Sequence, residues 1–320
     1  MLTGLPADQL TTLPAVARGA HWIDLLDPTV EELAAETPIE LHERAIRQLL
    51  DPLQPERLPR PRIESSIDHV LGVLLVAVVV EEEDRVFYQE VDFVATPDTI
   101  LTVRKTPPGE EPFSIEAVHE ACEAHGSPST GLVIYHLIDE IAERFLNLID
   151  SLDSEVDELE EGIESWANER IRRRLADLRE DVLVIRRTLA PTRDAIRRLV
   201  DGRVELAGED PFGRALQLYF GEAYDKLLRA TDGLDIAREL ISSARDYHQS
   251  KIAQDQSDVV RKLAVIASLL LVPTFIVGNY GQNFEEMPEL GWKLGYAFSW
   301  GIIALTTILQ LAFYRWRRWI

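Results

Sequence analysis

The chain has 320 residues, 55 of them acidic and 33 basic, which gives a formal net charge of −22 at pH 7. This charge excludes nucleic acid as an expected partner, because the phosphates would be repelled, and it favours small cations as ligands. The single cysteine, Cys122, excludes an internal disulfide and suits a reducing compartment, so we expect most of the chain in the cytosol. Residues 1–5 lack a basic region followed by an apolar run and predict neither a signal peptide nor a membrane anchor at that point.

The first part of the sequence, residues 1–110, alternates between strand and helix signals and predicts an α/β domain. Residues 22–25 are apolar enough for a strand, and a helix is expected to start within 28–35, with Asp27 as its N-cap. The predicted core strand, Val70–Val80, is almost wholly apolar, but its 11 residues are too few to cross a bilayer. Two further strands are expected at hairpin spacing, over 86–95 and 99–104.

Strand signals end at about Ser114, and residues 111–205 predict a pair of antiparallel helices. An acidic segment at 150–164 precedes an arginine-rich segment at 170–198. The acidic segment is typical either of a store for divalent cations or of a solvated face neutralised by the arginines, and we favour the second interpretation.

A long helix is then expected from Pro211 to Gly281, because only Pro273 interrupts the helical pattern and it predicts no more than a kink. Residues 206–262 are its stalk. The uncharged run of 22 residues from Leu263 to Phe284 is long enough to span a bilayer.

The second uncharged run has 21 residues, Leu294–Tyr314, and ends in a basic, aromatic tail at 315–320. We therefore expect membrane spans at 263–281 and 294–314, joined by a loop at 282–293. Basic residues flank the outer ends of the pair and the loop is acidic, so the positive-inside rule predicts a multi-pass protein of the cell membrane with both termini in the cytoplasm. A buried hairpin of a soluble protein is the less favoured alternative.

When the long helix is written as a heptad repeat, the residues along one stripe are mostly small or polar. Such a stripe predicts either a water path or close helix packing. Two spans cannot enclose a path alone, so a pore requires a ring of subunits. The stripe carries Asp246, Ala253, Val260, Ala267 and Thr274, with Ser250, Ser257, Ala264 and Leu271 beside it. The residues expected to line the pore are Val260, Leu263, Ala267, Leu271 and Thr274.

The segment Tyr280-Gly281-Gln282-Asn283, followed by Met287-Pro288-Glu289-Leu290, resembles the signature of the CorA family of divalent-cation channels, part of the two-transmembrane GxN superfamily. Residues 22–25 and 60–64 resemble N-terminal signatures of that family. The resemblance implies a funnel-shaped homopentamer in the lipid bilayer, with a cytoplasmic α/β domain, a stalk helix that continues into the pore-lining span, and an outer second span.

The same resemblance implies that Gly281, Gln282 and Asn283 form a selectivity filter. Gly281 is expected to end the helix in a conformation that other residues resist, and the Asn283 carbonyl to accept hydrogen bonds from hydrated Mg²⁺. Glu285, Glu286 and Glu289 would attract cations to the mouth. Gating by cytoplasmic cations between subunits is also implied, with Asp246 as the best carboxylate ligand and Glu222 and Asp255 as weaker candidates.

Gln282 replaces the methionine usual in the family, which leaves the ion open. The expected function is influx of Mg²⁺, with Co²⁺ or Ni²⁺ as companions. The alternatives are a ZntB-like zinc transporter of the same architecture, with or without proton coupling, and a non-conducting, membrane-anchored cation sensor. The sequence contains no catalytic signature, so an enzyme is not expected. His119, Cys122 and His125 have a zinc-like spacing, but on one helix they cannot converge on one ion.

Overall fold

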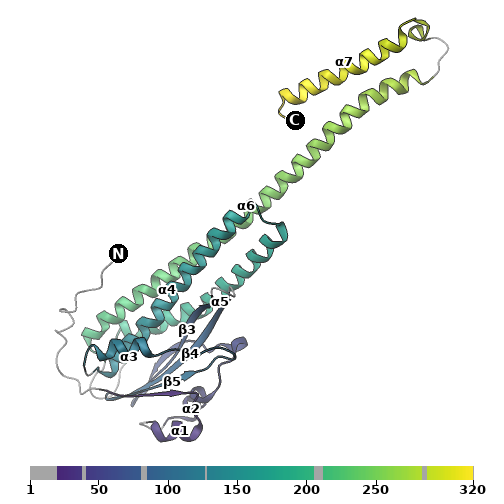
Figure 1. Ribbon diagram of the computed structural model, residues 1–320. Helices are drawn as coiled ribbons and strands as arrows, with labels where there is room; N and C mark the ends of the chain where they lie inside the picture. Colours follow the sequence, from purple (N-terminus) through teal and green to yellow (C-terminus); the bar gives the residue numbers. More distant parts are fainter. Residues whose placement is uncertain are drawn as a thin grey trace. The chain divides into compact units, whose positions relative to one another are not determined.

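The computed structural model describes residues 20–37, 41–80, 85–126, 128–204, 212–282 and 287–319 (Figure 1). The chain forms two compact units, Met1–Ala244 and Arg245–Ile320. The division falls inside the helix α6 (Arg214–Tyr280), so that the first unit ends and the second begins on the same helix.

The first unit is built on a five-stranded sheet with the strand order β1-β5-β4-β3-β2. Its central hairpin pairs β3 and β4 over eleven register positions, and β1 is parallel to β5 while the other pairs are antiparallel. The strands are β1 (His21–Leu26), β2 (Arg62–Ser65), β3 (Val70–Val80), β4 (Arg85–Ala95) and β5 (Thr99–Lys105). The predicted strands and the α/β class are confirmed.

Two short helices, α1 (Val30–Glu36) and α2 (Glu43–Leu50), follow β1, and a 3₁₀ turn η2 (Pro55–Arg57) leads into β2. The predicted N-cap was wrong, because Thr29 and not Asp27 caps α1. Thr29 and Glu32 form a capping box: the Thr29 hydroxyl accepts from the Glu32 backbone amide, and the Glu32 carboxylate accepts from the Thr29 backbone amide. Asp27 instead has a φ of 46° and accepts a hydrogen bond from the backbone amide of Thr106 at 2.9 Å.

The two faces of the sheet are covered by different helices. One face packs on the long helices α4 and α5, and the core there continues through the buried side of the first part of α6, including Phe220, Leu227 and Leu234. The other face packs on α1 and α2 through a smaller core that includes Leu33, Leu49 and Val103. Alternation along β4 and β5 therefore buries side chains on both faces.

α3 (Glu116–Glu123) packs against α4 (Thr130–Gly162), which forms a hairpin with α5 (Asn168–Val200). Ser129 caps α4, since its hydroxyl accepts from the Leu132 amide at 3.3 Å. The expected pairing of the acidic and arginine-rich segments is confirmed by an ion pair of 3.0 Å between Arg174 and Glu155.

The second unit contains the rest of α6, a 3₁₀ turn η4 (Pro288–Gly291) and α7 (Gly295–Trp316). α6 is one helix of 67 residues, and Pro273 lies within it without ending it. Pro211, where the helix was expected to begin, lies outside the described residues.

Candidate functional site

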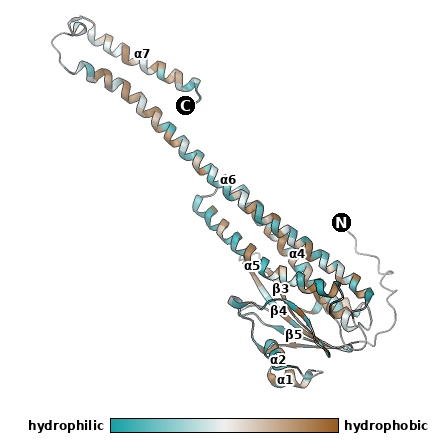
Figure 2. Cartoon of the chain, turned by 180° about the vertical axis from the view of Figure 1, so that it is seen from behind, coloured by the Kyte–Doolittle hydropathy of each residue, from teal (hydrophilic) through white to brown (hydrophobic). Residues whose placement is uncertain are grey.

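The end of α6 and α7 are both long and apolar enough to cross a membrane. Figure 2 colours much of α7 and of the last turns of α6 towards the hydrophobic end of the scale. Only 6% of the most apolar window of α6 and none of that of α7 is buried within the chain. A water-soluble helical hairpin would bury such surface, so these helices require lipid or other subunits around them.

Polar contacts hold α7 on one face of α6. The Ser268 hydroxyl lies 2.6 Å from the Tyr314 hydroxyl and donates to the Val265 carbonyl at 2.8 Å. The Gln310 amide donates to the Ser268 carbonyl at 3.2 Å, while its own carbonyl oxygen is buried without a hydrogen-bond partner. This cluster was missed from the sequence, although Gln310 is the single amide side chain in the run 294–314 and marks a helix contact.

The residues predicted to line a pore lie on the opposite face of α6. Residues two apart on a helix point about 200° away from each other, so Ala267 and Thr274 face away from Val265 and Val272, which lie on the α7 side. All five predicted side chains are exposed, Val260, Leu263 and Leu271 by 61–68%. Nothing in the described part of the chain covers this face of the second unit.

The filter signature lies at the C-terminal end of α6. The Gly281 amide still donates to the Val277 carbonyl at 2.9 Å, and the Gln282 side chain is exposed. The expectation that Gly281 ends the helix in a conformation that other residues resist was wrong, because its φ lies outside the left-handed region that favours glycine. A Cβ atom there would lie 3.2 Å from the Val277 carbonyl oxygen, which is close contact rather than a clash.

The remaining loop residues are described only in part. Asn283, Glu285 and Glu286 lie outside the described residues. Glu289 belongs to η4, but its side chain is not described.

The candidate regulatory carboxylates Asp246, Glu222 and Asp255 are all exposed. Asp246 pairs with Arg245, its Oδ1 lying 3.1 Å from Nη2 of the guanidinium. Within the ranges that the structure describes, no group of three or more His, Cys, Asp or Glu side chains in one chain converges as a metal site. Any cation held by these carboxylates would therefore need ligands from a second subunit or from water.

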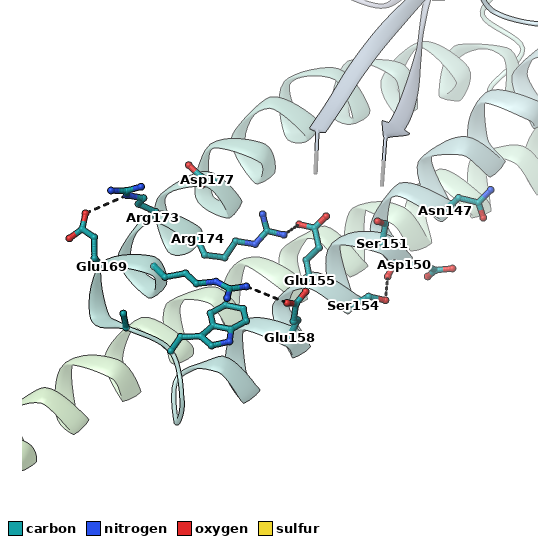
Figure 3. A pocket seen from close by; sticks show the side chains of 13 residues that line it. Asn147, Asp150, Ser151, Ser154, Glu155, Glu158, Glu169, Arg173, Arg174 and Asp177 are labelled. Carbon is teal, nitrogen blue, oxygen red and sulfur yellow. Dashed lines mark hydrogen bonds and ion pairs between the residues drawn. The ribbon is translucent and has the colours of Figure 1, made fainter. Parts of the chain in front are cut away.

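The acidic segment borders an open cavity of about 1230 Å³ between α4 and α5 (Figure 3). Arginines face its carboxylates: Arg174 lies 3.0 Å from Glu155, and Arg170, stacked over the Trp166 ring, lies 3.9 Å from Glu158. These contacts favour the neutralised face over a cation store. Asp153, on the same helix, has its pKa raised by partial burial and by Asp150 and Asp157.

His119 and Cys122 of α3 and His125, which follows that helix, do not form one cluster. His119 stacks on Trp22 with the ring centroids 3.9 Å apart, and Cys122 is buried. His125 instead approaches His136 of α4, with the centroids 5.2 Å apart. The sequence gives no sign of this pair, because it is created by the packing of α3 on α4.

Comparison with known proteins places the chain in a family. The family model described as "CorA-like Mg2+ transporter protein" matches residues 18–318. The chain is 27% identical over 188 residues to the "Cobalt/magnesium transport protein CorA" of Thermotoga maritima, a match that covers 59% of the chain and 52%, about half, of the relative. It is 25% identical over 307 residues to the "Putative metal ion transporter YfjQ" of Bacillus subtilis, covering 93% of the chain and 89% of the relative.

A third relative is the "Zinc transport protein ZntB" of Photorhabdus laumondii, 31% identical over 177 residues that cover 54% of the chain and 51% of the relative. Among solved structures, the CorA magnesium transporter of Methanocaldococcus jannaschii has the same fold, with a TM-score of 0.72 at 20% identity over 93% of this chain and 91% of that one. The full-length CmaX structure is similar with a TM-score of 0.63 at 21% identity, over 98% and 93% of the two chains.

The family model spans nearly the whole chain, and the solved structures share its α/β sheet, long helix and apolar C-terminal pair. The chain therefore belongs to the CorA family of divalent-cation transporters.

Proposed function

We propose that five copies of the chain form a channel that admits Mg²⁺, with Co²⁺ or Ni²⁺ as companions, into the cytoplasm. The observation that carries this proposal is the exposed face of α6 opposite α7, which ends at the Gly281-Gln282 signature. An uncovered, mostly small or polar stripe inside an apolar segment is suited to a ring of helices around water. Cyclic symmetry would supply that ring, and membership of the family supports a funnel-shaped pentamer.

The ring of filter residues offers neutral oxygen atoms to a hydrated ion. Mg²⁺ gives up its waters reluctantly, so the amide oxygens of Asn283 would accept hydrogen bonds from the hydration shell without stripping it. Gln282, exposed at the end of α6, would offer a second amide next to Asn283 in the sequence. A carboxylate in this place would hold the ion more tightly and slow its release.

Influx needs no energy source beyond the membrane potential. An inside-negative potential favours inward movement of a divalent ion by about 4–5 kcal/mol per 100 mV. The loop residues Glu285, Glu286 and Glu289 would raise the cation concentration at the outer mouth. The basic ends at Arg261-Lys262 and at 315–318 orient both termini to the cytoplasm.

Regulation by the transported ion is proposed for the exposed carboxylates on α6. Asp246 is accessible to a neighbouring subunit, and among the described residues its ion-pair partner is the exposed Arg245. Cations bound there between subunits would offset the repulsion among chains of charge −22 and hold the pore closed. Glu222 and Asp255 are weaker candidates for carboxylate ligands.

Zinc transport by the same architecture, with or without proton coupling, is the second candidate function. Two observations favour it: Gln282 differs from the usual methionine, and one relative is named as a zinc transport protein. Both candidates use the same pore, so they differ in the ion and in its driving force rather than in the fold.

The test is flux into liposomes that contain the purified full chain, with dyes for Mg²⁺ and Zn²⁺ inside. We expect Mg²⁺ influx that increases with an inside-negative potential and falls at least about tenfold in Asn283→Ala. Asn147→Ala removes an equivalent amide from an exposed site on α4 and should leave flux unchanged. Zn²⁺ flux without Mg²⁺ flux would select the second candidate; flux of neither ion would reject both and favour the non-conducting sensor.

A further inference from the structure

His125 and His136 are brought together by the turn between α3 and α4. His125 follows the end of α3, and Gly126 adopts a φ of 82°, which glycine permits without strain. The chain then enters α4, where His136 lies in the second turn. The side chains of His125 and His136 are both half-buried.

The hydrogen bonds leave one nitrogen of each ring available. Nδ1 of His125 lies 2.8 Å from the Ala121 carbonyl oxygen. A carbonyl oxygen can only accept, so Nδ1 carries a proton, and in the neutral ring Nε2 then has the lone pair. Nε2 of His136 is buried and has no hydrogen-bond partner. An N–H donated to a backbone carbonyl is the usual way in which a metal-binding histidine is oriented.

The separation of the two rings also fits one shared ion. A metal–nitrogen bond of about 2 Å puts each ring centroid about 3.2 Å from the ion, so two imidazoles in tetrahedral arrangement have centroids about 5 Å apart. The observed separation is 5.2 Å with the planes inclined by 45°.

We propose that His125 and His136 form a binding site for a single Zn²⁺, Ni²⁺ or Co²⁺ ion in the first unit, separate from the conduction pathway. Imidazole nitrogen selects these ions over Mg²⁺, which prefers oxygen. Asp139, one turn beyond His136, does not complete the site, because its Oδ1 lies 2.8 Å from Nζ of Lys226. Water would fill the remaining positions, so the ion would exchange and could act as a signal of transition-metal supply.

Co²⁺ spectroscopy on the full chain in detergent tests the proposal. Excess Mg²⁺ occupies sites made of oxygen, and Co²⁺ is then titrated while its visible ligand-field bands are recorded. We expect one nitrogen-ligated Co²⁺ per chain, with affinity reduced at least about tenfold in His125→Phe and in His136→Phe. His119→Phe is the matched control, since His119 stacks on Trp22, and it should keep the bands. Unchanged bands in both pair variants would overturn the proposal.

A second measurement needs no substitution and so does not depend on the folding of a variant. Diethylpyrocarbonate modification of each histidine in the wild-type chain is followed by mass spectrometry with and without Zn²⁺. We expect Zn²⁺ to slow modification of His125 and His136 at least about tenfold and to leave His119 unaffected. Equal rates with and without Zn²⁺ at the pair would contradict the site. Asn283→Ala should retain the protection, which separates this site from the proposed pore.

Discussion

At the scale of single residues, the least ordinary feature of the first unit is a buried charge cluster on the sheet. Glu90 and Lys105 face each other across β4 and β5, with Glu90 Oε1 2.6 Å from Lys105 Nζ. Asp92 is fully buried beside them, its Oδ2 3.2 Å from the same Nζ but without a well-aligned hydrogen bond. Gln48 of α2 also donates to Glu90 Oε1, at 2.9 Å. One ammonium group therefore faces two carboxyl groups.

The ionisation of Asp92 should make the stability of the chain depend on pH. Burial first, and then Glu90, raise the pKa of Asp92 well above 3.8, while Lys105 opposes the shift. Between 3.8 and the raised pKa the folded chain holds a proton that the unfolded chain has released, so this residue lowers stability as the pH rises. The other charged groups facing it, Glu90 and Lys105, are paired with each other. Arg62 donates to the Gln48 side chain at 3.3 Å and forms an ion pair with Glu64.

Asp92→Asn removes this titration and keeps the shape of the side chain. Between pH 3.8 and the raised pKa of Asp92, the free energy of unfolding of this variant should increase relative to that of the wild type. The expected increase is on the order of 1 kcal/mol for each pH unit. Thermal unfolding of the full chain in detergent between about pH 5 and about pH 8 measures the difference. Asp235→Asn, at an exposed site on α6, serves as the control. Parallel pH profiles for Asp92→Asn and wild type would show that Asp92 is ionised in the folded chain.

At the scale of elements, the sequence predicts the core strands and the two apolar spans well because their signals are local. Val70–Val80 is a continuous apolar, β-branched run, and the spans are long uncharged runs with basic ends. The N-cap of α1 was misassigned although Thr29 and Glu32 have the spacing of a capping box. The parallel pairing of β1 with β5 and the contact of His125 with His136 depend on distant packing and have no local signal.

The α4–α5 hairpin offers a prediction about ion pairs of unequal burial. Arg174 and Glu155 are 17% and 23% exposed, whereas Arg173 and Glu169 are 76% and 58% exposed. Water screens the second pair, so Arg173→Ala should change the free energy of unfolding by less than about 0.5 kcal/mol. Arg174→Ala should cost about 1–2 kcal/mol, because it leaves a carboxylate partly buried without its guanidinium.

Thermal unfolding of the two arginine variants in detergent, at low and high salt, provides the comparison. The loss in Arg174→Ala should persist at high salt, since partly buried pairs are weakly screened. Equal losses in the two variants would mean that burial does not decide the contribution of these pairs.

At the scale of the whole molecule, the proposed channel requires several copies of α6 around a water-filled path. The described residues of one chain leave the face of α6 opposite α7 uncovered, and the charge of −22 disfavours assembly without bound cations. The family and the two apolar helices follow from the sequence, but the ring does not, because a subunit interface leaves no periodic signal distinct from helix packing. The central proposal is therefore that the stripe on α6 lines a pore and that residues 281–283 form its filter.

Introduced cysteines on α6 test that proposal most directly. Cys122 is buried, and burial raises the pKa of its thiol to about 11, so the wild-type channel should not react with a charged thiol reagent. Ala267→Cys and Thr274→Cys should each give Mg²⁺ flux into liposomes that the reagent blocks by at least about tenfold. Leu305→Cys, on an exposed position of α7, should conduct and remain unblocked. Block at Leu305 with none at Ala267 or Thr274 would contradict a pore lined by α6.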